Sequence, residues 1–366
     1  MRRRQWPPIV VLATLAGCFG LIGCRNEADS PTSKEDAAAA SSGSEPSVDR
    51  EAIETALAAA NEYLNGLDLP EAEIILEKLI ERAPREVRAR ELMGQVLSLK
   101  ADQALRSGDH EASAAVRSRA YEHYRQACQI EPGSAGLQQS AGVMAMAAGR
   151  IDAALAHFTE AAHLDGTNPQ HPLYEAQILI QRKRYAEARD SLDRVLALDP
   201  DEPLAHASLA MIALEEGRFG EALAHIAQAR QLVPGDLRFR VQEAKIHRRA
   251  GNPTRALELL TGLPAADRAD GGITVEIAAA YTDLGEHEKA AEAWAHRYRQ
   301  RPTDRLAYLA AVRAGEAYLR AGQREAAKLW LEQALIAGGS TGGGAGGGAG
   351  GGAPEVRALQ EALEGS

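Results

Sequence analysis

Three cysteines are the residues of this chain whose type and spacing could do chemistry, and two of them stand close together. Cys18 and Cys24 lie six residues apart in the apolar stretch LAGCFGLIGC, and Cys128 is the only thiol that follows them. Two cysteines cannot supply the four ligands of a structural zinc site, and no histidine or acidic residue stands between them. The segment in which they lie explains them better than a metal or a disulfide does.

Residues 1–23 have the order of regions that is typical of an export signal. The basic start MRRR precedes an uncharged segment, which is shorter than the roughly 20 residues that a membrane-spanning helix needs. The segment resembles a bacterial lipoprotein signal, in which a Leu, two small or aliphatic residues and a Cys mark the cleavage point and the Cys is acylated. Both LAGC, which ends at Cys18, and LIGC, which ends at Cys24, match this pattern.

We expect lipidation at Cys24, with Cys18 as the alternative. Cleavage before Cys18 would leave Phe19 and Leu21 on the new terminus, whereas Cys24 is followed directly by the polar residues RNE. The resemblance implies an exported protein, anchored by lipid to the bacterial cell envelope on the periplasmic face of the outer membrane. An ordinary secretory signal with incidental cysteines is the alternative, and it also implies export.

Composition limits the class of partner. Without residues 1–23 the formal net charge falls from −10 to −13, because three arginines are lost with them. Nucleic-acid binding needs a basic stripe, so a chain this acidic predicts no nucleic-acid partner. Anionic lipid headgroups would also repel it, and any membrane attachment must therefore come from the lipid.

Two segments of low complexity flank the part of the chain that we expect to fold, residues 51–337. Residues 24–50 contain a single large apolar side chain and predict a disordered tether. Residues 338–353 contain 11 glycines in 16 positions and predict a flexible linker. The final segment, residues 354–366, carries an apolar stripe in PEVRALQEAL and predicts a short helix that docks over the last repeat or in a partner.

The central part repeats with a period of 34 residues. Pro200 and Pro234 are one period apart, and repeats begin at positions 53, 87, 135, 169, 203, 237, 271 and 308. Each repeat predicts two helices. A small residue recurs in the first helix, namely Ala60, Gly94, Gly142, Ala176, Ala210, Ala244, Ala278 and Gly315. An Ala recurs in the second helix and is followed four residues later by a large side chain such as Tyr124, Phe158 or Trp294.

These columns describe closely packed helix pairs, because two helices approach only where side chains are short and a bulky residue fills the gap beside the crossing. The pattern resembles the tetratricopeptide repeat family. The resemblance implies an all-α fold, a right-handed α-solenoid of about eight helix-turn-helix repeats. The second repeat, residues 87–134, is longer than its neighbours by close to two helical turns in each helix, which predicts a projecting hairpin.

No catalytic, metal-binding or cofactor-binding motif is found in the sequence. The histidines are scattered, and no Gly-rich phosphate loop or nucleophile elbow occurs. We therefore expect no enzyme, no cofactor, no metal and no small-molecule substrate. Cys128 lies within a predicted helix, and we interpret it as a small buried apolar residue.

The resemblance places the first helices on a concave face, and the residues supply its chemistry. Positions i, i+4 and i+7 of each first helix form an apolar stripe with glutamines, and the sixth repeat adds a basic group. The predicted partner-binding residues are Gln139, Val143, Met146, Leu173, Gln177, Ile180, Met211, Leu214, Arg238, Lys245, Arg248 and Arg249.

The sequence thus predicts a non-enzymatic scaffold or adaptor that binds a segment of a partner protein in the concave groove. The alternative is a subunit of a polysaccharide export or cell-wall assembly machine. Glycan sites usually need aromatic platforms, and Tyr174 is the only one near the stripe. Some members of the family grip a terminal carboxylate with a Lys and an Asn four residues apart, and these columns lack that pair.

Overall fold

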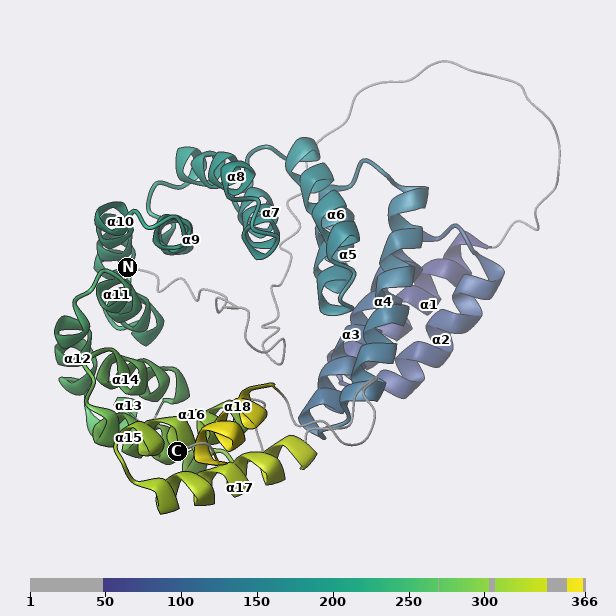
Figure 1. The fold of residues 1–366 in the computed structure, drawn as a ribbon. Helices are drawn as coiled ribbons and strands as arrows, with labels where there is room; N and C mark the ends of the chain where they lie inside the picture. Colours follow the sequence, from purple (N-terminus) through teal and green to yellow (C-terminus); the bar gives the residue numbers. More distant parts are fainter. Residues whose placement is uncertain (1–48, 269, 303–306, 341–353, 365–366) are drawn as a thin grey trace. The chain divides into compact units, whose positions relative to one another are not determined.

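The computed structural model describes residues 49–268, 270–302, 307–340 and 354–364, and every regular element in them is an α-helix (Figure 1). The predicted all-α architecture of stacked helix pairs is confirmed. Both cysteines of the predicted signal and nearly all of the predicted tether lie outside the described residues. The predicted linker was expected from residue 338, but the helix before it continues to Ser340.

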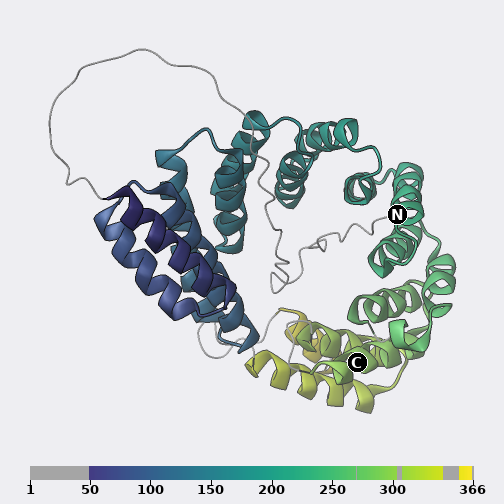
Figure 2. The same ribbon diagram turned by 180° about the vertical axis from the view of Figure 1, so that it is seen from behind.

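The chain divides into two compact units, which meet in sequence at Pro200 and Asp201. The N-terminal unit contains the first four repeats, and the C-terminal unit contains the other four. The helices of the N-terminal unit are α1 (Arg50–Asn65), α2 (Leu69–Arg82), α3 (Val87–Arg106), α4 (His110–Ile130), α5 (Ala135–Ala147), α6 (Ile151–Leu164), α7 (Gln170–Gln181) and α8 (Tyr185–Leu198). Figure 2 shows α1 and α2 side by side, as the helices of one repeat.

The C-terminal unit continues the same arrangement and ends in an extra helix. Its helices are α9 (Pro203–Glu215), α10 (Phe219–Leu232), α11 (Leu237–Arg249), α12 (Pro253–Thr261), α13 (Ala265–Arg268), α14 (Gly271–Asp283), α15 (His287–Gln300), α16 (Ala307–Arg320), α17 (Arg324–Ser340) and α18 (Pro354–Glu364). Within each unit a first helix packs on the second helix of its own repeat and, where another repeat precedes it in that unit, on the second helix of that repeat.

Close contacts between small and large residues hold the helix pairs together. Gly94 of α3 lies against the ring of Tyr124 of α4, so closely that a Cβ atom at Gly94 would lie 2.5 Å from that ring. Gly142 of α5 lies against Phe158 of α6 in the same way, at 3.0 Å. Both aromatic side chains are buried. The columns of small and bulky residues therefore mark the helix crossings, as the sequence predicts.

The turn inside each repeat reverses the chain through one residue in the left-handed region. In the turn AAGRI that residue is Gly149, with φ of 73°, and glycine adopts this conformation without steric strain. Lys183 occupies the equivalent place in IQRKRY, with φ of 58°. A side chain at that angle is strained, so the fourth repeat closes its turn less favourably than its neighbours do.

The second repeat is a long hairpin, in which α3 and α4 have 20 and 21 residues whereas α5 to α8 have 12 to 14. Polar contacts secure the part that extends beyond its neighbours. Ser113 donates a hydrogen bond to the carbonyl oxygen of Ala101 at 2.9 Å. Glu73 of α2 accepts from Lys100 and Arg119, one on each helix of the hairpin. Although burial opposes them, these two partners lower the pKa of Glu73.

In each unit one ion pair joins equivalent positions of two neighbouring repeats, and we call such a pair a rung. Arg88 bonds Glu54, in the same column one repeat earlier, at 2.7 Å in the N-terminal unit. In the C-terminal unit Arg249 bonds Glu215, again one repeat earlier, at 2.7 Å. These pairs are solvent-exposed, so each contributes no more than about 1 kcal/mol.

Cys128 is a buried free thiol in α4, as its place in the sequence predicts. Burial raises its pKa to about 11. The thiolate is the reactive form of cysteine, and at neutral pH this residue holds its proton. Cys128 therefore acts as a small apolar side chain of the core.

Candidate partner-binding faces

The first helices of the third and fourth repeats present a partly exposed apolar face in the N-terminal unit. Val143 and Met146 of α5 and Ile180 of α7 are each neither buried nor fully exposed. Gln139 and Gln177 lie on the same helices and are partly exposed as well. We call these five residues the N-terminal face. Its chemistry suits an apolar segment whose backbone or polar side chains can bond to the two amides.

Two leucines predicted to line the binding stripe are instead part of the core. Leu173 is 2% exposed and Leu214 is 1% exposed, so neither can contact a partner. Gln139 occupies the column of Leu173 one repeat earlier and stays partly exposed. A leucine at the edge of the apolar face gains free energy by turning into the interior, whereas a glutamine would lose its hydration there.

In the C-terminal unit the predicted apolar position Met211 of α9 is partly exposed, and Lys245 of α11 is partly exposed in the equivalent column. We call these two residues the C-terminal face. Gln242 of α11 donates a hydrogen bond to the carbonyl oxygen of Ala207 at 2.7 Å and so fixes α11 against α9. This face is smaller and more polar than the N-terminal face.

The predicted basic group of the sixth repeat is largely neutralised. Arg238 pairs with Asp236, its neighbour at the start of α11, and Arg249 pairs with Glu215 of α9. Arg248 lies 2.8 Å from Asp283 and 3.1 Å from Glu276, and although burial opposes them these carboxylates raise its pKa. Lys245 forms no ion pair with any residue that the structure describes.

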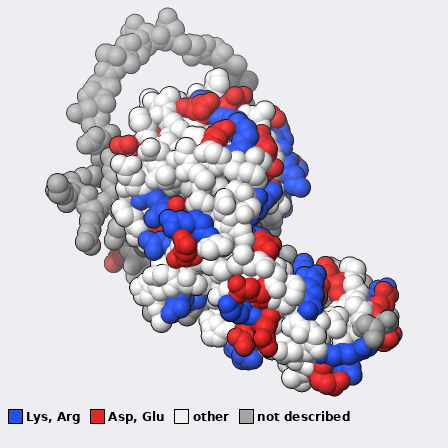
Figure 3. Space-filling model, turned by 60° about the vertical axis from the view of Figure 1, so that its left-hand side comes forward, with Lys and Arg blue, Asp and Glu red and all other residues white. Residues whose placement is uncertain are grey.

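Basic and acidic side chains also lie close together on the molecular surface. Figure 3 shows Lys and Arg side chains interspersed with Asp and Glu on the face that it draws. Of the four predicted basic residues, Lys245 therefore retains the charge most available to a partner. The sequence could not reveal this pairing, because the partners of Arg248 stand 28 and 35 residues after it on another repeat.

Tyr174 is a poor platform for a sugar. Its ring stacks on Phe158 with centroids 4.7 Å apart and planes inclined by 19°. Burial raises the pKa of its hydroxyl. One face of the ring is therefore covered by the core, and the side chain supports the N-terminal face from beneath.

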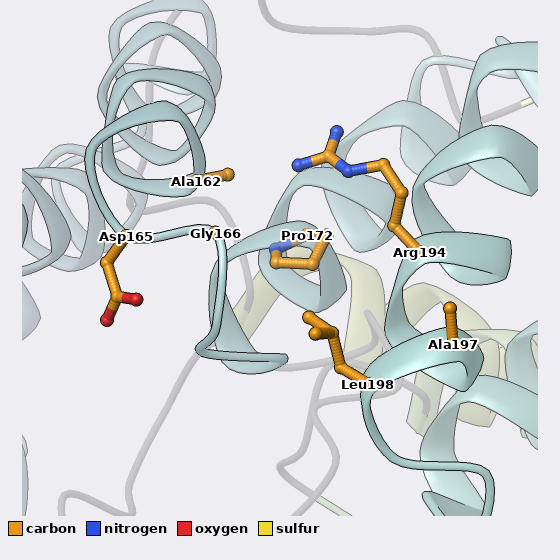
Figure 4. Close-up of a pocket in the computed structure, with 7 residues that line it drawn as sticks. All are labelled: Ala162, Asp165, Gly166, Pro172, Arg194, Ala197 and Leu198. Carbon is orange, nitrogen blue, oxygen red and sulfur yellow. The ribbon is translucent and has the colours of Figure 1, made fainter.

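The sequence did not predict a pocket that lies in the N-terminal unit. It is lined by a turn and several small side chains, which form no recognisable motif. Figure 4 shows it between α6, α7 and α8, with Asp165 pointing away from the guanidinium of Arg194. Its lining residues are Ala162, Asp165, Gly166, Pro172, Arg194, Ala197 and Leu198. Arg194 lies 3.2 Å from Glu175, and the remaining lining is mostly apolar. The pocket does not bring an acid and a base together for catalysis.

Histidines close to each other or to acidic residues do not assemble a metal site. His171 is 1% exposed, and burial lowers its pKa, so its imidazole is neutral near pH 7 although Asp165 lies 3.9 Å away. His206 and His225 place their Nδ1 atoms 3.4 Å apart. Within the described ranges no group of three or more His, Cys, Asp or Glu side chains could hold a metal ion.

Across the helices that the structure describes, none combines the length and apolar character needed to cross a membrane.

Comparisons with known proteins point to one architecture. A family model described as tetratricopeptide repeat matches residues 145–212 and 213–273. A tetratricopeptide repeat protein from Parabacteroides merdae has a similar fold, with a TM-score of 0.54 and 14% identity over 78% of this chain and 99% of that one. Yeast Tom70 gives a TM-score of 0.52 and 13% identity over 78% of each chain. At these identities the likeness concerns the fold alone.

One curated relative has a name that describes its role. The cytochrome c-type biogenesis protein CycH of Rhizobium meliloti strain 1021 is 35% identical over 91 residues. The match spans 24% of this chain and 24% of that protein, so the two share a local stretch and about a quarter of their length.

Proposed function

This chain is a tetratricopeptide repeat protein, and from that premise we propose that it is a non-enzymatic scaffold of the bacterial cell envelope that binds a segment of a partner protein. Such repeat proteins are generally non-catalytic scaffolds, and their fold supports protein or peptide binding. The observation that carries the proposal is the N-terminal face, where Val143, Met146 and Ile180 stay partly exposed on first helices. Apolar side chains in this setting release water when a partner covers them.

The chemistry of the two faces defines the segment that each would take. The N-terminal face suits an apolar side of a partner segment, because three of its five side chains are apolar and the others are neutral amides. Methionine adapts its shape to varied partners, and each face contributes one. In the C-terminal unit Lys245 would favour a carboxylate beside the apolar contact with Met211.

A charge placed on either face should weaken partner binding, whereas a charge placed on a second helix should not. We expect Ile180→Glu in the N-terminal unit and Met211→Glu in the C-terminal unit each to weaken partner binding at least tenfold, because a carboxylate would be desolvated against an apolar surface. The matched controls are Ala186→Glu on α8 and Ala227→Glu on α10, which place the same charge on exposed positions of second helices.

The measurement is photo-crosslinking in envelope membranes, followed by titration of the crosslinked partner. A crosslinking amino acid at Val143 should capture a partner that one at Glu160, which is exposed on α6, does not. Capture of one partner from both positions, with normal binding to both face variants, would show that the first helices are not the site. The projecting hairpin around residues 107–115 would then be the next surface to test.

The same proposal places the protein at the envelope through a lipid on Cys24, with Cys18 as the alternative. The polar sequence that begins at Arg25 supports Cys24, since the mature chain would then be apolar only in its lipid. Two or more acyl chains would hold it stably at the periplasmic face of the outer membrane, whereas one gives marginal binding. Mass spectrometry of the mature terminus should find an acylated peptide that begins at Cys24. An acylated peptide that begins at Cys18 would contradict this choice, and unmodified cysteine would refute lipid anchoring.

The local likeness to a cytochrome c-type biogenesis protein supports a role in assembling other envelope proteins. Such a role fits a scaffold that holds a segment of its client while another component acts on it. A place in a polysaccharide export or cell-wall machine has less support, because Tyr174 is partly covered by Phe158.

A further inference from the structure

The last helix of the described chain, α18, is held to the eighth repeat by three side chains on one of its faces. Val356, Leu359 and Leu363 are buried, whereas the other eight residues of α18 are exposed. Figure 1 shows α18 alongside α16 and α17, and it packs on both. The first helices α3, α11 and α14 make this pair of contacts with the repeat before them, so α18 occupies the place of a ninth first helix.

The eighth repeat is shaped to receive Leu359. A Cβ atom at Gly315 of α16 would lie 2.7 Å from Cδ2 of Leu359, but 3.5 Å from the nearest atoms of its own repeat, in Ala327 and Trp330. At Gly94 and Gly142 the crowding side chain comes from the second helix of the same repeat. The space left by Gly315 therefore serves α18 and not the pairing of α16 with α17.

A hydrogen bond sets the direction in which a helix can lie on this surface. Arg324, the first residue of α17, donates from its guanidinium to the carbonyl oxygen of Leu363 near the end of α18. The last carbonyl groups of a helix lack partners within the helix, and a cation there is favourable. We call the surface formed by Gly315, Tyr318, Arg324, Ala327 and Leu331 the terminal docking surface.

The attachment of α18 differs from the other joints of its unit. Thirteen residues, 341–353, separate α17 from α18, and nine of them are glycine, whereas three residues join α16 to α17. A helix of 11 residues is too short to be stable by itself in water. Its place on the terminal docking surface is thus that of a tethered ligand.

We propose that the terminal docking surface is a second binding site of this protein, which binds an amphipathic helix of a partner. In the free protein α18 occupies this surface and competes with the partner helix for it. The partner helix would carry apolar residues at i, i+3 and i+7, the spacing of Val356, Leu359 and Leu363. Its last turn would meet Arg324. A tethered ligand has an effective concentration in the millimolar range, so α18 lowers the apparent affinity for the partner helix without preventing its binding.

The test uses the full mature chain and a fluorescent synthetic peptide of residues 354–366 as the probe. Leu359→Glu in the chain should release α18, and the peptide should then bind roughly tenfold or more tightly than it binds the parent. Ala358→Glu is the matched control, because Ala358 is exposed on the same helix, and this variant should bind the peptide as the parent does. Equal binding by Leu359→Glu and Ala358→Glu would overturn the proposal.

A second substitution tests the surface itself. Gly315→Ala, added to Leu359→Glu, should weaken peptide binding about tenfold, since the new methyl group would overlap the leucine of the peptide. It should not lower the melting temperature, because the methyl group meets its own repeat at ordinary contact distance and alanine favours the helix. Peptide binding that Gly315→Ala leaves unchanged would refute the proposed surface.

The parent protein offers a measurement that needs no variant. Hydrogen exchange should be at least tenfold faster at the amides of α18 than at those of α16 and α17, because the tethered helix would leave while the repeat stays folded. Equal rates in the three helices would mean that they open together, and the proposal would fail. A dimeric parent that Leu359→Glu converts to a monomer would also overturn it, by showing that α18 is exchanged between two copies.

Discussion

Replacing Phe158 with alanine should lower the free energy of unfolding of the N-terminal unit by about 3–5 kcal/mol. The Phe158 ring is fully buried, lies against Gly142 and stacks on Tyr174. Because Gly142 has no side chain to move into the space, the cavity would stay open, and Tyr174 would lose its contact on one face. Neither residue can collapse into the vacancy without shifting a helix.

Urea unfolding of residues 24–366, which lack Trp6, would measure this loss. Circular dichroism follows the helices of both units, while Trp294 and Trp330, the tryptophans of the described residues, lie in the C-terminal unit and report on it by fluorescence. Leu164→Ala is the control, since Leu164 lies on the same helix and is exposed, and it should change stability by less than about 1 kcal/mol. A loss of that small size for Phe158→Ala would show that the ring does not anchor this crossing.

Gly94→Ala should destabilise the second repeat, although the same change stabilises most helices. Alanine in a helix interior is favoured over glycine by about 1 kcal/mol. At Gly94 the new methyl carbon would lie 2.5 to 2.8 Å from three ring atoms of Tyr124, which is itself buried and cannot move aside. Overpacking of this kind costs about 1–3 kcal/mol, so we expect the unfolding midpoint to fall.

Two variants make this expectation specific. Gly136→Ala on α5 has no neighbouring atom within 4 Å of the new carbon and should leave the midpoint unchanged or higher. Combining Gly94→Ala with Tyr124→Leu should cost less than the sum of the two changes, since the smaller side chain leaves room for the methyl group. A midpoint that rises on Gly94→Ala alone would mean that the helices can separate without loss.

The sequence predicts the packing of this protein better than its surface. The columns that contain Gly142 and Phe158 recur in every repeat, and such regularity follows from helix crossings that recur. Exposure depends on residue type as well as on column, so a spacing rule cannot separate Leu173, which is buried, from Gln139, which is not. A small rotation of the helix about its axis decides whether a side chain in this column is buried or exposed.

Polar contacts between residues on different repeats could not be predicted from the sequence either. The pairing of Arg248 with Glu276 and Asp283 depends on how α11 lies against α14, which no local pattern encodes. The place of α18 was left between the last repeat and a partner, and the structure places it on the last repeat. Gly315 could have indicated where α18 docks, because Leu359 fills the space that it leaves. In the sequence, however, Gly315 cannot be told apart from the other small residues of its column.

The rungs between Glu54 and Arg88, and between Glu215 and Arg249, have a consequence for how such a chain can grow or shrink. Each rung joins one column of a repeat to the same column of the next. A tandem duplication of one repeat alone would set Glu beside Glu or Arg beside Arg in that column, whereas duplication of the two repeats of a rung together would keep opposite charges adjacent. One extra residue inside a helix would turn the residues that follow it in that helix by about 100° and move the charged side chain out of its column. Because a single exposed pair contributes little free energy, the rungs limit which duplications keep opposite charges adjacent more than they stabilise either unit.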